Sequence, residues 1–137
     1  NTDGLTLSDI GRLVDGVIEH EKMQFDPPEG NFTPGRDVAK LLLNMAMLGL
    51  EALPNRGRLT VGFEDGTTQG LRVIAEADGA ALRPESMDAL NPDCDPETLT
   101  ARSVQSFLTA WLARGMGSAL SVECSDGSVR LNALLAR

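Results

Sequence analysis

His20 and Glu21 are neighbours in this sequence and are the first candidates for chemistry. A solvent-facing histidine on a helix can act as a nucleophile when a neighbouring carboxylate orients its ring. His20 is the only histidine in the chain, and it falls where a first helix should end and a strand should begin at Lys22. We therefore interpret it as a polar residue near a helix C-terminus, where a protonated ring favours the helix dipole.

A second group of polar residues is the acidic loop that contains Asp93, Asp95 and Glu97. Its carboxylates could contact Ca²⁺, but prolines and Cys94 interrupt the spacing of an EF-hand loop, so we predict a solvated loop. Cys94 and Cys124 lack the CxxC spacing of zinc sites and indicate reduced thiols in the cytoplasm. The sequence therefore predicts no catalytic, cofactor-binding or metal-binding residue.

Composition and charge restrict the classes of partner. The chain has 137 residues and a net charge of −8, which fits one soluble domain and argues against nucleic acid and anionic membranes. No apolar run reaches the ~18 residues of a membrane span, and no secretory signal is visible. The net charge is compatible with a basic protein partner. Arg102, Arg114 and Arg130 could instead meet an acidic one, although the sequence does not place them on one surface.

The longest predicted element is a helix followed by a strand, in residues 33–63. Thr33 can cap the helix and Pro34 suits its first turn, while Pro54 and Gly57 should stop it. Leu59, Val61 and Phe63 then alternate with polar residues, as in a half-buried strand. One apolar stripe at three- and four-residue steps runs along the helix: Val38, Leu41, Leu42, Met45, Leu48, Gly49 and Ala52.

Shorter elements flank this unit. Before it, Ser8 should cap a helix that runs to about Glu19, and residues 22–25 should form a strand. After it, an Asp-Gly hairpin turn at residues 64–67 should connect the strand to a return strand over 71–75. The first helix has five apolar residues for its buried side: Ile10, Leu13, Val14, Val17 and Ile18.

The C-terminal part predicts two helices and a hairpin. A short helix should span residues 84–90, and Thr98 or Thr100 should cap a longer one. The strands 119–124 and 128–134 should form the final hairpin, turned by Asp126-Gly127. The longer helix should end at Gly115 and Gly117. Its predicted buried stripe is Val104, Phe107, Leu108, Trp111 and Leu112.

This order of elements predicts an α+β fold. Because most of the strands sit in hairpins, we expect one mixed, mainly antiparallel sheet with helices packed on one face, a two-layer α/β sandwich. Residues 1–6 should form a linker or a disordered start, and residues 7–137 one domain.

The central unit also carries a family resemblance. Leu42-Leu43-Asn44 through Glu51-Ala52-Leu53-Pro54, followed by Gly57-Arg58-Leu59-Thr60-Val61, resembles the asparagine-box helix and following strand of histidine-kinase-type (GHKL, Bergerat-fold) ATP-binding domains. That fold is the two-layer sandwich that the order of elements predicts.

The nucleotide boxes of that family are incomplete in this sequence. The first box asparagine matches Asn44, but the second, which helps to hold Mg²⁺, falls on Leu48, whose side chain offers no oxygen to a hard cation. The Asp-x-Gly-x-Gly box aligns with residues 77–81, so that Ala77 replaces its aspartate and Ala81 its last glycine. The lid region, residues 92–100, has no glycine to turn N–H groups toward phosphate. We therefore predict that ATP binding is lost.

A closer resemblance covers most of residues 7–136. Thr100–Ala110, Leu112–Gly117 and Asp126–Ala133 look like the end of the ChpT-type histidine phosphotransferases of alphaproteobacteria, in which a degenerate kinase-like domain follows a two-helix dimerisation hairpin. The resemblance implies a cytoplasmic phosphorelay role, with response-regulator receiver domains as partners.

In that family the phospho-accepting histidine lies in the hairpin, so we expect it outside this chain, which would be a fragment of a homodimeric protein. The resemblance implies no cofactor and no autonomous kinase or ATPase activity. Two alternatives stay open: a working GHKL-type ATPase or kinase domain with divergent boxes, and an unrelated α/β binding module.

Overall fold

The computed structural model describes residues 6–18, 22–30, 33–54, 56–64, 69–91 and 93–135. Four helices and five strands are mixed along this part of the chain, and one short 3-10 helix, η2, precedes the last helix. In chain order the elements are α1 (Leu7–Asp15), β1 (Met23–Asp26), α2 (Arg36–Ala52), β2 (Gly57–Phe63), β3 (Gly70–Glu76), α3 (Pro84–Ala89), η2 (Pro96–Thr98), α4 (Val104–Gly115), β4 (Leu120–Ser125) and β5 (Ser128–Leu134).

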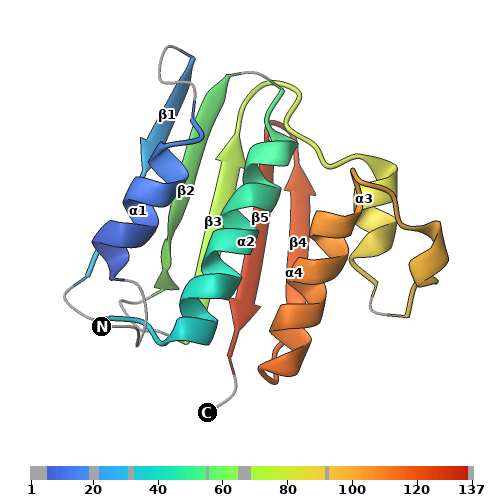
Figure 1. Ribbon diagram of the computed structural model, residues 1–137. Helices are drawn as coiled ribbons and strands as arrows, with labels where there is room; N and C mark the ends of the chain where they lie inside the picture. Colours follow the sequence, from blue (N-terminus) through green and yellow to red (C-terminus); the bar gives the residue numbers. More distant parts are fainter. Residues whose placement is uncertain are drawn as a thin grey trace.

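The strands form one sheet in the order β1-β2-β3-β5-β4. Among the strands of the described residues, β1 and β2 pair in parallel, and the other pairs are antiparallel. Helices α1, α2 and α4 lie on one face of this sheet, with α3 beside the end of α4 (Figure 1). The predicted two-layer α+β sandwich is therefore confirmed. No helix in the described ranges is long and apolar enough to cross a bilayer.

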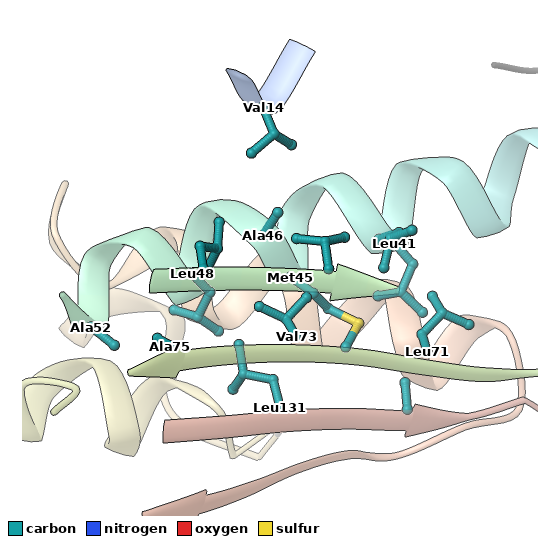
Figure 2. Close-up of a cluster of buried hydrophobic side chains, with 14 of the residues drawn as sticks. Val14, Leu41, Met45, Ala46, Leu48, Ala52, Leu71, Val73, Ala75 and Leu131 are labelled. Carbon is teal, nitrogen blue, oxygen red and sulfur yellow. The ribbon is translucent and has the colours of Figure 1, made fainter. Parts of the chain in front are cut away.

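The core lies between α2 and the middle of the sheet. Figure 2 shows Leu41, Met45 and Leu48 of α2 beside Val73 of β3 and Leu131 of β5, and all five are fully buried. These positions of α2 recur at three- and four-residue steps, so one helix face meets the apolar side of the strands. The stripe predicted for α2 is confirmed, with Val38 at its half-buried end.

Helix α2 begins later than predicted and ends, as predicted, just before Pro54. It starts at Arg36 behind Gly35, which makes no side-chain capping bond, so Thr33 and Pro34 precede the helix rather than cap it. Leu53 is the C-cap residue. Its backbone dihedrals are extended, so the helix cannot continue beyond it. Gly57 then opens β2 instead of terminating the helix.

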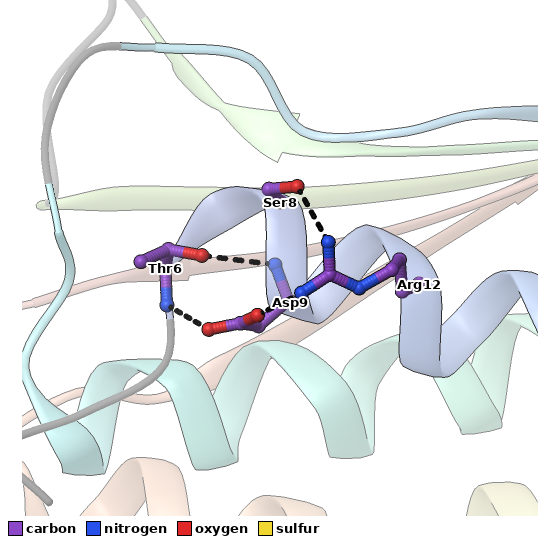
Figure 3. Close-up of polar contacts among 4 residues, drawn as sticks. All are labelled: Thr6, Ser8, Asp9 and Arg12. Carbon is purple, nitrogen blue, oxygen red and sulfur yellow. Dashed lines mark hydrogen bonds and ion pairs between the residues drawn. The ribbon is translucent and has the colours of Figure 1, made fainter. Parts of the chain in front are cut away.

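Helix α1 is shorter than predicted and has a different cap. Thr6, not Ser8, is the N-cap: its hydroxyl accepts from the Asp9 N–H at 3.0 Å, and the Asp9 carboxylate accepts from the Thr6 N–H at 3.1 Å (Figure 3). These bonds, led by the one from the Thr6 backbone, hold the pKa of Asp9 below its usual range.

The buried side of α1 is also narrower than predicted. Ile10, Val14 and Ile18 are buried, but Leu13 and Val17 are more than half exposed. Helix α1 packs against α2 only along this narrow stripe, because it lies near the β1 edge of the molecule (Figure 1). Two of the five positions predicted as buried were therefore wrong.

Helix α4 departs most from its prediction. Its buried residues are Ser106, Thr109, Ala110 and Ala113, whereas Leu108 and Trp111 of the predicted stripe are exposed. The N-cap position is Ser103 rather than Thr98 or Thr100. The remaining residues of the predicted stripe are exposed or half-buried: Val104, Phe107 and Leu112.

The other predicted elements are confirmed, with small shifts. The final hairpin turns at Asp126-Gly127, where Gly127 has a φ of 80°. The 64–67 turn lies largely outside the described residues, although β2 and β3 pair as its prediction requires.

At the sheet edge, Arg58 donates to Asp26 Oδ2 at 2.7 Å and so holds the pKa of that carboxyl below its usual range.

Candidate functional site

Asn44 lies on α2 where that helix meets α4, and its side chain is already paired on both sides. Its Nδ2 donates to the Lys40 carbonyl at 2.8 Å, and its Oδ1 accepts from Gln105 Nε2 at 2.6 Å. Gln105 Nε2 also donates to the Thr109 hydroxyl at 3.4 Å, and this hydroxyl donates to the backbone carbonyl of Gln105 at 2.7 Å. The oxygen that could face a ligand at this position therefore faces helix α4.

Leu48, one helical turn after Asn44, is fully buried in the core (Figure 2). An aliphatic side chain with no exposed surface can neither ligate a cation nor bond a phosphate. The structure thus places Asn44 and Leu48 on one helix but in different surroundings. Asn44 lies in the contact between α2 and α4, and Leu48 lies in the hydrophobic core.

The segment after β3 folds tightly onto the protein. The Ala80 N–H donates to the Ala77 carbonyl at 3.0 Å, and the Ala81 N–H donates to the Ala52 carbonyl at the end of α2 at 2.9 Å. Gly79, with a φ of 82°, permits this turn. The two N–H groups of the turn therefore bond the protein itself, and Ala77 has no carboxylate to offer.

The segment between α3 and α4 pairs much of its backbone with its own side chains. Asp95 Oδ1 accepts from the Glu97 N–H at 3.0 Å, and Ser103 Oγ accepts from the Thr100 N–H at 2.9 Å. The Asp93 N–H bonds Asn91 Oδ1 at 2.9 Å. These N–H groups are oriented inward within the loop, so they do not form an open cradle for phosphate.

A polar cluster joins α2, α3 and the turn before α4. The buried Ser86 hydroxyl donates to Glu51 Oε2 and lies 3.5 Å from the Arg102 carbonyl. Ser106, also fully buried on the inner face of α4, has a hydroxyl with no hydrogen-bond partner among the described residues. One buried serine is thus satisfied and the other is not.

We expect Ser106→Ala to raise the free energy of unfolding by about 1 kcal/mol, because it removes an unpaired buried hydroxyl and places a better helix former in α4. Ser86→Ala is the matched control, since it removes a paired hydroxyl and should lower that free energy by about 1–2 kcal/mol. Urea titration of both variants measures the difference. Equal destabilisation by both would contradict the assignment of Ser106 as unsatisfied.

The remaining sequence candidates are His20 with Glu21, the acidic loop and the two cysteines. His20 and Glu21 lie outside the described residues. Across the residues that the structure describes, no three histidine, cysteine or acidic side chains are placed to hold a metal ion. Cys94 and Cys124 are free thiols.

Sequence reasoning missed Gln105, Ser86 and the outward face of α4. Gln105 pairs with a residue 61 positions away, and Ser86 with one 35 positions away. No local pattern marks such partners, since they depend on how three helices pack. The outward face of α4 does have a signal in the sequence, its apolar stripe. The sequence predicts this stripe as the buried face, whereas the structure exposes much of it to solvent.

Comparison with solved structures identifies the class of fold. The catalytic domain of the histidine kinase ThkA matches 95% of this chain and 93% of its own, with a TM-score of 0.60 at 15% identity. A bacterial phosphotransferase matches 94% of this chain and 63% of its own, with a TM-score of 0.79 at 24% identity. The fold is therefore that of a histidine kinase catalytic domain, which removes the alternative of an unrelated α/β module.

Sequence comparison identifies the family within this class. The chain belongs to the histidine phosphotransferase C-terminal domain family, whose model matches residues 7–128. It is 28% identical over 127 residues to the protein phosphotransferase ChpT of Brucella abortus (strain 2308). That match covers 91% of this chain but 60% of the relative, so the chain spans less than two thirds of the relative's length. The predicted resemblance to ChpT-type phosphotransferases is confirmed.

Proposed function

We propose that this chain is the C-terminal domain of a phosphorelay histidine phosphotransferase, that it does not bind ATP, and that it helps to dock the receiver domains of response regulators. The phospho-accepting histidine would lie in a helical hairpin outside residues 1–137, and the same hairpin would make the whole protein a dimer. Free Cys94 and Cys124 are compatible with the cytoplasm, where we place it.

The observation that carries the loss of ATP binding is the contact of α2 with α4. Asn44 already pairs with Gln105, and Leu48 is fully buried where a kinase box would require a second amide. Each polar contact missing from a nucleotide site costs about 1–3 kcal/mol of binding free energy. Two or three such losses would weaken binding by roughly two to five orders of magnitude.

Calorimetric titration of the chain with ATP, with and without Mg²⁺, tests this proposal. We expect no measurable heat of binding, and no rise in the melting temperature at millimolar Mg-ATP, because only a ligand that binds the folded state stabilises it. A nucleotide-binding histidine kinase catalytic domain under the same conditions is the positive control. Mg²⁺-dependent binding at micromolar concentration would favour the second candidate, a working ATPase or kinase domain with divergent boxes.

A further inference from the structure

Helix α4 presents its large apolar side chains to solvent. Val104, Leu108 and Trp111 are 38, 44 and 61% exposed, while small side chains such as Ala110 and Ala113 form the buried face. The three exposed residues are spaced by four and three positions, so they form one continuous stripe along the helix. We call this set the α4 stripe. Folding of the described chain does not bury it.

The α4 stripe continues into a groove at the C-terminal end of the helix. The groove has a volume of about 480 Å³ and reaches from α4 to the first turn of α2. Four of its lining side chains are large and apolar, and two are charged: Phe107, Trp111, Leu112 and Met116, with Arg114 and Asp37. Trp111 belongs to both features, so stripe and groove form a single surface.

The charge of this segment is opposite to that of the whole protein. The chain carries 20 acidic residues and a net charge of −8, yet residues 98–122 contain no aspartate or glutamate. Within that segment Arg102 and Arg114, both exposed, flank the two ends of α4. Asp37, on α2, is the acidic residue among those that line the groove. An apolar stripe with an arginine at each end matches an apolar surface bordered by carboxylates.

We propose that the α4 stripe is the surface on which an acidic receiver domain docks by means of an apolar helix face. This assignment rests on the proposed function and adds the location and chemistry of the contact. The stripe spacing is that of side-chain ridges that pack against another helix. A second copy of this chain fits less well, because an antiparallel pair of α4 helices would bring Arg102 of each copy near Arg114 of the other.

Trp111 makes the contact directly measurable. It is the only tryptophan, and the chain has no tyrosine, so intrinsic fluorescence reports on the α4 stripe alone. The probes are purified receiver domains without tryptophan, from the response regulators of the organism that carries this chain. Docking should shift the Trp111 emission to the blue, and the affinity should fall as salt increases, because arginine–carboxylate contacts are screened.

Variants that keep Trp111 locate the surface. We expect Leu108→Glu to weaken receiver binding by about tenfold or more, and Arg114→Glu to weaken it by about threefold to tenfold with less salt dependence. Val17→Glu is the matched control, since it places the same charge at an exposed aliphatic position just after α1 and should change the affinity less than about twofold.

The outcomes separate this assignment from the proposed function. If Leu108→Glu and Val17→Glu bind receiver domains equally strongly, the α4 stripe is not the docking surface, while the docking function stands. Absence of binding by every receiver domain would overturn the docking function, and this assignment with it. A blue shift that grows with protein concentration alone would identify a second copy as the occupant and overturn the acidic partner.

Discussion

Leu48→Asn should lower the free energy of unfolding by roughly 3–8 kcal/mol and should not create a nucleotide site. The substitution supplies the second amide of a kinase asparagine box, but Leu48 is fully buried in the core. Loss of the aliphatic volume costs about 2–5 kcal/mol, and burying an amide without partners costs about 1–3 kcal/mol more. This is a large part of the 5–15 kcal/mol that stabilises a typical domain.

Chemical denaturation of the variant, followed by calorimetry with Mg-ATP, measures both parts of this prediction. Leu48→Met is the control, since a volume-conserving apolar replacement should cost less than about 1.5 kcal/mol. If Leu48→Asn folded with native stability and bound Mg-ATP, a single side chain would separate this domain from a nucleotide-binding kinase domain. That result would refute the explanation based on the contact between α2 and α4.

Gly57→Ala should lower the free energy of unfolding by about 2–5 kcal/mol. Gly57 opens β2 with a φ of 133°, a conformation that side-chain-bearing residues rarely adopt. A Cβ at this position would lie 2.4 Å from the Glu76 carbonyl oxygen and 2.7 Å from the Ala77 Cβ. A backbone oxygen in a central strand pair cannot move aside cheaply, so strain and overlap add.

Gly62→Ala in the same strand is the matched control for this prediction. A Cβ at Gly62 meets no atom within 4 Å, and we expect a neutral or slightly stabilising effect. Urea titration of both variants gives the comparison. A Gly57→Ala variant as stable as Gly62→Ala would show that the start of β2 can relax. It would also show that the backbone at residue 57 does not require glycine.

Part of the candidate site followed from the chain alone. Leu48 and Ala77 each replace a chemically necessary group with an aliphatic one, and side-chain type does not depend on the fold. What could not be predicted is which residue the remaining box asparagine contacts. The pairing of Asn44 with Gln105 joins residues 61 positions apart, and it exists only because α4 packs on α2.

The sequence by itself determined the helices and strands, the two-layer class and the buried face of α2, because apolar periodicity and turn residues act over a few positions. Only the tertiary structure decided which side of α4 is buried. Close packing of α4 on α2 favours the small side chains Ser106, Ala110 and Ala113, since interaxial distance depends on side-chain size. An apolar stripe therefore indicates that a helix has two different faces, and its neighbours decide which face becomes the core.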